Sequence, residues 1–105
     1  MILLIQAALA ADCPTPVAPA DILKTAASAR TSFAGMDAEQ FTAQVATMEA
    51  EVDCLARQLT PQQAAEIHTV RALAGFLSSD EVASGASFQA ALAAQPDLSL
   101  DWLPS

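Results

Sequence analysis

The sequence predicts an all-α fold of four antiparallel helices arranged in two hairpins. Three observations lead to this fold class. About a quarter of the residues are alanine, which costs least in a helix. Apolar residues in the middle of the chain recur at steps of four and three, the spacing of one helix face. Signals for helix starts follow closely on signals for helix ends, so neighbouring helices must fold back on one another.

The longest periodic stretch, residues 37–59, predicts the second helix, which we expect to be the wall shared by the two hairpins. Asp37 is its expected N-cap, and Gln40, three residues later, is placed to complete a capping box. A single apolar stripe follows, formed by Phe41, Val45, Met48, Val52, Leu55 and Leu59.

The first helix is expected to begin at Pro19, a residue suited to the first helical turn, and to end at Gly35. Its predicted apolar face consists of Ile22, Ala26, Ala29 and Phe33, with Leu23 alongside. Only Gly35 and Met36 separate it from Asp37. The first two helices should therefore form an antiparallel hairpin with Phe33 opposite Phe41 across the turn.

A capping box of Thr60 and Gln63, with Pro61 at the first helical position, predicts the start of the third helix. Its expected core face is Ala64, Ile67, Val70, Ala74 and Leu77, with Leu73 beside it. A further capping box of Ser78 and Glu81 predicts the start of the fourth helix. That helix should close before Pro96 and carries Val82, Ser84, Phe88, Ala91 and Leu92. Its small residues, Gly85 and Ala86 among them, predict close contact with the third helix.

Residues 1–10 are interpreted as a signal peptide. The run from Ile2 to Leu9 is apolar, and Ala8-Leu9-Ala10 has the small-x-small pattern of a cleavage site, although no positive charge precedes it. Export would place the chain in the periplasm or outside a bacterial cell. The alternative is a packed N-terminal segment of a cytoplasmic protein. Residues 11–18 follow as an extended, proline-stiffened segment before the helical domain at 19–96.

The two cysteines predict one disulfide, between Cys13 and Cys54. The hairpin geometry places Cys54 opposite about residue 20, and the extended residues after Cys13 can reach that point. An even cysteine count and a leader-like start favour an oxidising compartment. Without export, Cys54 would instead be an inert buried thiol and Cys13 a free one.

Residues 61–96 resemble a tetratricopeptide repeat. The resemblance is carried by Ala72-Leu73-Ala74-Gly75-Phe76-Leu77, the turn from Ser78 to Glu81, and then Ser84, Phe88, Ala91 and Pro96 at spacings of four, three and five. The sequence departs from the family in having no large aromatic residue early in the third helix and glycine at position 85. The whole chain is also similar to exported, alanine-rich helical proteins of myxobacteria and their relatives. The resemblance implies stacked hairpins that bind proteins without catalysis.

The C-terminal tail, residues 97–105, alternates apolar and polar residues up to Trp102. One interpretation is that Leu98, Leu100 and Trp102 or Leu103 fold back over the fourth helix as a terminal cap. The other is that they form an exposed anchor for a partner.

Charge and motif content argue against several functions. The net charge is −8 with four cationic side chains, so nucleic acid is not an expected partner. His68 has no second ligand at helical spacing, and a set of Ser78, His68 and Asp80 lacks any oxyanion loop. The acids Glu49, Glu51 and Asp53 lie on a predicted helix, with Arg57 as the expected surface partner of Asp53. We therefore expect no metal, no cofactor and no catalysis.

These observations lead to two hypotheses for function. The first is an exported scaffold or adaptor that binds another protein through the edge of the third and fourth helices, with Phe88, Trp102, Leu100 and Leu98 as candidate contacts. The second is a structural subunit that associates with itself through the same edge.

Overall fold

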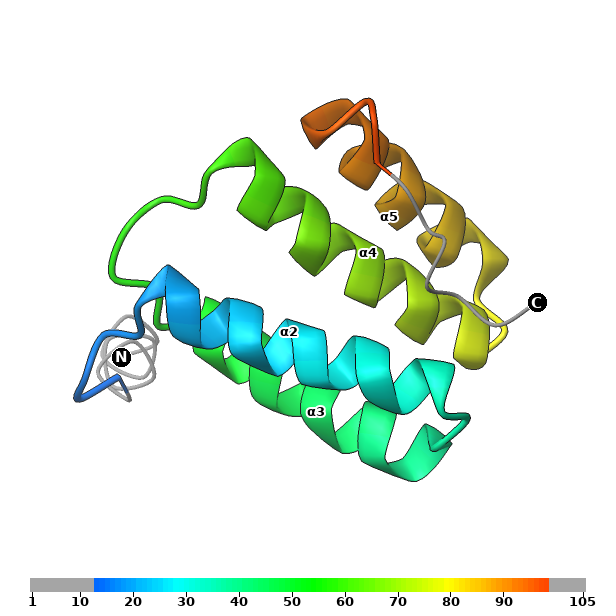
Figure 1. The fold of residues 1–105 in the computed structure, drawn as a ribbon, viewed down its shortest axis with the longest axis horizontal. Helices are drawn as coiled ribbons and strands as arrows, with labels where there is room; N and C mark the ends of the chain where they lie inside the picture. The colour runs from blue at the N-terminus through cyan, green and yellow to red at the C-terminus, as the bar shows by residue number, and fades with distance from the viewer. Residues whose placement is uncertain (1–12, 99–105) are drawn as a thin grey trace, which may run out of the picture.

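Four helices make up the part of the chain that the computed structural model describes, residues 13–98. They are α2 (Pro19–Ala34), α3 (Ala38–Val52), α4 (Pro61–Leu77) and α5 (Glu81–Ala94). Figure 1 shows two antiparallel hairpins, α2–α3 and α4–α5, laid against each other. The predicted fold class is confirmed. The predicted leader lies outside the described residues, as do residues 99–105 of the tail.

The central helix of the fold is α4 and not α3, which differs from the expected shared wall. Helix α4 contacts α5 along its length and also contacts both helices of the first hairpin, α2 more extensively than α3. It is buried on two sides. Ile67, Val70 and Leu73 face the first hairpin, while Ala72 and Gly75 meet Ser84 of α5.

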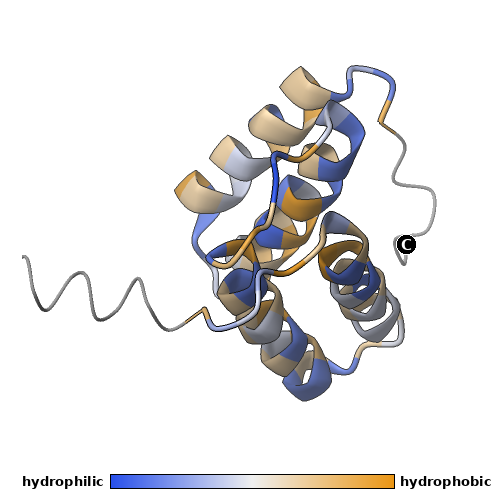
Figure 2. Ribbon diagram, turned by 90° about the vertical axis from the view of Figure 1, so that its left-hand side faces the viewer, coloured by the Kyte–Doolittle hydropathy of each residue, from blue (hydrophilic) through white to orange (hydrophobic). Residues whose placement is uncertain are grey.

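The hydrophobic core lies between the two hairpins, where the orange segments of both meet in Figure 2. Its buried members come from three helices: Ile22, Ala26, Ala29, Phe41, Met48, Ile67, Val70 and Leu73. The predicted apolar faces of the first two helices are thereby confirmed. The predictions are less accurate further along the chain, because Leu77 and Val82 have large exposed fractions of 43% and 84%.

The α2–α3 turn brings Phe33 and Phe41 together as predicted, with ring centroids 5.3 Å apart in an edge-on arrangement. The expected capping box is only half formed. Asp37 accepts a hydrogen bond from the Gln40 N–H at 3.1 Å, but its own N–H donates to the Ser32 carbonyl at 2.9 Å. That second bond closes a Schellman turn, in which the left-handed residue is Met36 (φ 61°) and not Gly35.

Helix α3 ends at Val52, so the prediction of a helix to residue 59 was wrong. The following backbone pairs with the extended segment before α2. The Val17 N–H donates to the Cys54 carbonyl at 2.7 Å, and the Ala56 N–H donates to the Val17 carbonyl at 2.8 Å. Leu55 and Leu59 nevertheless pack against the core as the stripe predicted. Because the helix has ended, Asp53 and Arg57 do not have the helical spacing expected of an ion pair.

A disulfide joins Cys13 to Cys54 beside this pairing, with the two Cα atoms 5.5 Å apart. The predicted bond is confirmed in the structure. It fastens the segment before α2 to the end of α3, at the opposite end of the first hairpin from the Met36 turn.

The predicted capping box at the start of α4 is confirmed. The Gln63 N–H donates to the Thr60 hydroxyl at 3.2 Å, and the Thr60 N–H donates to the Gln63 side chain at 2.9 Å. The box expected from Ser78 and Glu81 is wrong. Ser78 instead ends α4, and Asp80 caps α5 by accepting a hydrogen bond from Ala83 N–H at 3.1 Å.

The two hairpins turn in the same way. Asp37 and Asp80, 43 positions apart (80 minus 37), are both N-caps that follow a left-handed residue, Met36 or Ser79. The Asp80 N–H donates to the Gly75 carbonyl, the counterpart of the bond from Asp37 to Ser32. The same offset relates buried positions of the two hairpins, which pair as Ile22 with Ala65, Ala26 with Thr69, Ala29 with Ala72, Phe41 with Ser84, and Met48 with Ala91. The second hairpin thus repeats the first, with smaller residues at the positions of Ile22, Phe41 and Met48.

Candidate functional site

Large apolar side chains are exposed where the two hairpin turns lie. Met36, on the first turn, is 78% exposed, and Phe76 and Leu77, at the end of α4, are 67% and 43% exposed. We call these three residues and the hollows they line the turn-end surface. It lies at the opposite end of the first hairpin from the disulfide.

Three hollows lie at this surface, and the first shares lining residues with each of the other two. One of about 320 Å³ lies between the two turns and is lined by Phe33, Met36, Asp37, Ala38, Phe41, Phe76 and Leu77. A second of about 470 Å³ lies on α5 and is lined by Phe76, Ser79, Glu81, Ser84, Gly85 and Phe88. A third of about 250 Å³ lies between α3 and α4 and is lined by Phe41, Thr42, Val45, Ala74, Leu77 and Ser78. Phe76 lines both the first and the second hollow, so a chain bound in one could extend over the Phe76 ring into the other.

The candidate contacts predicted from sequence are only partly placed by the structure. Phe88 is half-buried and lines the α5 hollow together with Phe76. Leu98 is half-buried after a turn in which its N–H donates to the Gln95 carbonyl at 3.0 Å, and it is not among the residues that line the hollows. Leu100 and Trp102 lie outside the described residues.

Sequence reasoning missed Met36 and placed Leu77 in the core. A signal for Phe76 was present in the sequence. It stands 43 positions after Phe33, immediately before a turn of the same kind. Phe33 has the Phe41 ring beside it, whereas the residue that corresponds to Phe41 in the second hairpin is Ser84. Phe76 therefore has no aromatic partner at the corresponding position.

Ser84 and Gly75 explain why the second hairpin leaves no room for such a partner between its helices. The Ser84 hydroxyl donates to the Ala72 carbonyl at 2.8 Å, and a Cβ on Gly75 would lie 2.9 Å from the Ser84 N. This close approach of α4 and α5 was expected at Gly85. A Cβ on Gly85, however, would meet no atom within 4 Å, because that residue opens into the α5 hollow.

Acidic side chains lie beside the turn-end surface, and two of them, Asp37 and Glu81, line its hollows. Those exposed in or beside the first turns of α3 and α5 are Asp37, Glu39, Asp80 and Glu81. The cations of the described residues lie elsewhere. Lys24 is ten positions before the end of α2, about 15 Å along the axis. Arg57 is in the loop at the other end of the first hairpin.

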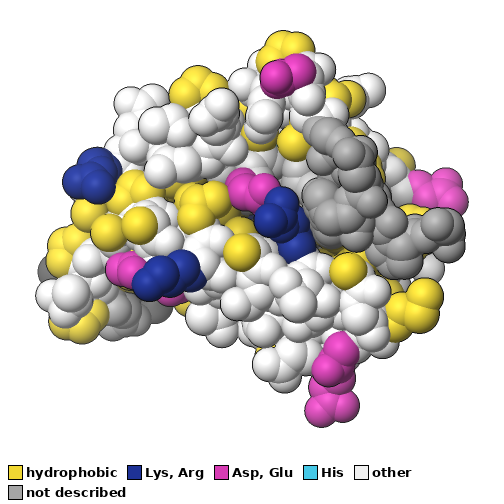
Figure 3. All heavy atoms as spheres, viewed as in Figure 1, with side chains coloured by type: hydrophobic (Ala, Val, Ile, Leu, Met, Phe, Trp, Pro, Cys, Tyr) yellow, Lys and Arg dark blue, Asp and Glu magenta, His cyan; other side chains and the backbone are white. Residues whose placement is uncertain are grey.

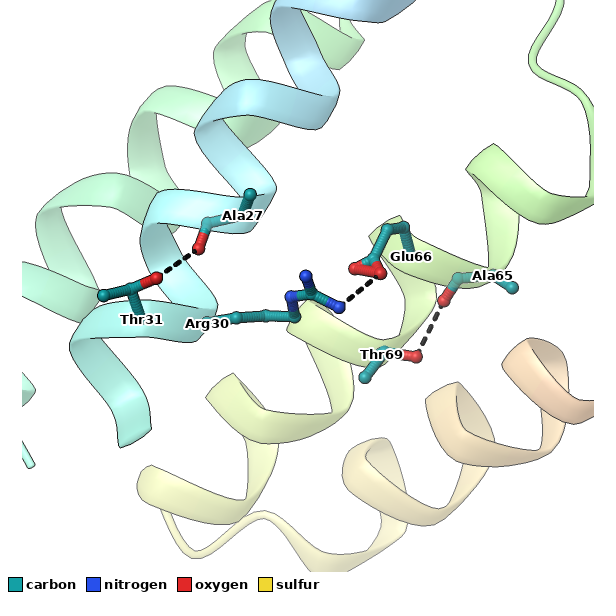
Figure 4. A network of polar contacts seen from close by, with 6 residues as sticks. All are labelled: Ala27, Arg30, Thr31, Ala65, Glu66 and Thr69. Carbon is teal, nitrogen blue, oxygen red and sulfur yellow. Dashed lines mark hydrogen bonds and ion pairs between the residues drawn. The ribbon is translucent and has the colours of Figure 1, made fainter. Parts of the chain in front are cut away.

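The two remaining arginines link the hairpins through ion pairs. Arg30 of α2 reaches Glu66 of α4 at 2.7 Å, and Figure 4 shows the two side chains pointing toward each other across the gap between these helices. On the face drawn in Figure 3, basic and acidic side chains meet in the middle of the molecule. Arg71 of α4 binds Glu49 of α3 through two hydrogen bonds. Both pairs link a helix of the first hairpin to α4 of the second.

Two of the three side chains considered for catalysis, Ser78 and Asp80, are engaged at helix ends. The Ser78 hydroxyl donates to the Gly75 carbonyl, and the Asp80 carboxylate caps α5. His68 is ten positions before Ser78 on α4, about 15 Å along the axis. Burial, reinforced by nearby Arg71, lowers the pKa of His68 from its usual 6.5. Among residues 13–98, no group of three or more His, Cys, Asp or Glu side chains is arranged to hold a metal ion.

Comparison with known proteins gives no relative from which function could be transferred. No protein-family model, curated protein or solved structure matches the chain. Within the described part of the chain, no helix is both long and apolar enough to cross a bilayer.

Proposed function

We propose that the chain is an exported helical adaptor that binds another protein through the turn-end surface and catalyses no reaction itself. The observation that carries this proposal is the exposure of Met36, Phe76 and Leu77 together, on two adjacent turns and beside three neighbouring hollows. Bulky apolar residues gathered at one site mark interaction surfaces, whereas single exposed apolar residues need no explanation.

The conformation of Met36 adds to this argument. A residue with a side chain is disfavoured at a φ of 61°, and Gly35 stands immediately beside it in the sequence. Backbone strain of this kind persists where the surrounding structure or a function demands it. Here it presents a flexible thioether side chain to solvent, a type of side chain common at adaptable binding surfaces.

Export is supported by the disulfide between Cys13 and Cys54, since such bonds persist in oxidising compartments. The periplasm or the outside of a bacterial cell would provide such an environment. The resemblance of residues 61–96 to a tetratricopeptide repeat is part of the same proposal, because that family consists of protein-binding scaffolds.

A second candidate function is a structural subunit that associates with itself. It is favoured by the outer side of α5, where Val82 is 84% and Leu92 is 47% exposed. Stacked helical hairpins bury their faces against further hairpins, and two hairpins leave one such face open.

A photo-crosslinking experiment separates these functions. A photoreactive phenylalanine analogue replaces either Phe76 or Val82 in cells that naturally make the protein. The adaptor proposal expects crosslinks from position 76 to a different protein. Crosslinks from position 82 to a second copy, with a mass by light scattering that rises with concentration, would favour the subunit. Absence of any intermolecular crosslink from position 76 would contradict the adaptor proposal.

A further inference from the structure

We infer that the turn-end surface binds a cationic amphipathic segment of its partner, with a bulky apolar side chain beside Phe76 and Lys or Arg side chains against the acidic rim. This inference rests on the proposed adaptor function and specifies the partner's chemistry. It follows from a missing aromatic contact and from the distribution of charge.

The missing contact defines the apolar half of the ligand. In the first hairpin, Phe41 is 1% exposed and its ring packs edge-on with that of Phe33. In the second, the equivalent Phe76 has only Ser84 at that position, and its ring borders the hollow of about 470 Å³ that reaches Phe88. A hollow lined by two phenylalanines, Phe76 and Phe88, is suited to an aromatic or large aliphatic side chain from another chain.

The acidic rim defines the charged half. Four exposed carboxylates, those of Asp37, Glu39, Asp80 and Glu81, lie at the first turns of two helices. Each helix start offsets about half a unit of negative charge, so about three negative charges remain uncompensated. A partner segment with basic residues would gain attraction and faster association from this field.

The same charges disfavour the other candidate occupants. A second copy of the chain carries a net charge of −8. The chain's own tail is acidic as well, with Asp97 and Asp101 flanking Leu98 and Leu100. Either one would bring like charge to the rim, a repulsion that works against docking. Charge complementarity therefore selects a different, basic chain.

The test uses the full chain and a labelled peptide of about four helical turns, with Phe and Leu along one face and Lys elsewhere. A matched peptide carries Glu in place of every Lys. We expect the Lys peptide to bind, to weaken as salt rises, and to bind more tightly than the Glu peptide by fluorescence anisotropy. Phe76→Ser should abolish binding. Leu92→Ser, which also replaces a large exposed apolar side chain but lies outside the hollows, should not.

Charge variants isolate the role of the rim. Glu39→Gln with Glu81→Gln leaves both N-caps intact and should weaken the Lys peptide about fivefold, the effect of two exposed pairs. Asp21→Asn with Asp97→Asn removes the same charge elsewhere and should have little effect. Circular dichroism checks that each variant is folded. Met36→Ser replaces Phe76→Ser as the binding-deficient variant should the latter unfold.

Several outcomes would overturn the inference. Equal binding of the Glu peptide would refute the charge assignment while leaving the adaptor function intact, and failure of both peptides would refute the ligand class. Binding to Trp102→Ser but not to the parent chain would assign the hollow to the tail. A doubled mass that Phe76→Ser abolishes would assign it to a second copy. Failure of the adaptor function itself would show separately, as the loss of crosslinks from position 76 in cells.

Discussion

The guanidinium of Arg71 on α4 donates two hydrogen bonds to the carboxylate of Glu49 on α3, of 2.8 Å from Nε and 2.7 Å from Nη2. Both side chains are partly exposed, at 33% and 42%. The planar fork of arginine matches a carboxylate in a way that the ammonium of lysine cannot. This pair and the pair of Arg30 with Glu66 link the two hairpins at the border of their shared core.

The first prediction concerns the geometry of this pair. Arg71→Lys keeps the charge and loses one of the two hydrogen bonds, so the free energy of unfolding should fall by about 0.5–1 kcal/mol, the range of partly exposed pairs. Urea denaturation measures this change in the free energy of unfolding. Arg57→Lys, in an exposed loop, is the matched control and should be neutral. Equal stabilities for the two variants would show that the bidentate contact contributes nothing.

The second prediction concerns pH and His68. Burial, and then repulsion by Arg71, lowers the pKa of His68 below its usual 6.5, although Glu49 partly opposes this. The unfolded chain then binds a proton more readily than the folded chain as pH falls. The contribution of neutral His68 to the free energy of unfolding is therefore fully present above about pH 6.5. It should be lost as the pH falls from there through the lowered pKa of the folded chain. His68→Gln should lose less over the same range in urea titrations.

Direct titration of the imidazole by NMR provides the complementary measurement. Arg71→Met removes a repelling charge and leaves Glu49 in place, so the midpoint of His68 should move upward. A midpoint at or above the usual value in the parent chain would contradict the environment described for His68.

Local rules determined those parts of the fold that the sequence predicted correctly. Thr60 and Gln63 form their capping box because each needs only a partner three residues away. The contact of Phe33 with Phe41 follows from a short turn between two periodic stretches. The disulfide was predictable because the hairpin fixed where Cys54 would lie.

The errors arose where tertiary contacts overrode a local pattern. Nothing between Val52 and Leu59 stops a helix, yet the backbone there pairs with Val17 and leaves the helix. Two serines and an aspartate in succession offered alternative caps, and Asp80 was selected by the Schellman turn before it. The exposure of Met36 and Phe76 was not predicted, because it depends on how the two hairpins stack.

The third prediction uses two glycines as a matched pair. Gly75→Ala would place a Cβ 2.9 Å from the Ser84 backbone N and 3.1 Å from its Cα, and backbone atoms cannot move aside cheaply. We expect a loss of about 1–3 kcal/mol as α4 and α5 are forced apart. Gly85→Ala meets open space within a helix and should instead gain about 0.5–1 kcal/mol. Equal effects of the two substitutions on the urea midpoint would contradict the close approach at Gly75.

The fourth prediction concerns the disulfide. Cys13 and Cys54 are 41 residues apart, and closing a loop of this length stabilises a chain by about 4 kcal/mol in the entropy model. Cys13→Ser with Cys54→Ser should lower the free energy of unfolding by about 2–4 kcal/mol, because removal of native bonds in small domains falls in this range. Treating the parent with reductant should produce the same loss. A loss in the double variant that reductant does not reproduce would point to damage from the substitutions.

The last prediction separates stability from binding at the two turns. Met36 and Ser79 have φ values of 61° and 62°, a conformation that glycine adopts without steric cost. Met36→Gly and Ser79→Gly should therefore each raise the free energy of unfolding by about 0.5–1 kcal/mol, after the extra chain entropy of glycine is counted. Only Met36→Gly removes a large apolar side chain from the turn-end surface, so only it should weaken the Lys peptide. If Met36→Gly gained stability and bound the peptide as tightly as Ser79→Gly, the strained methionine would have no part in binding.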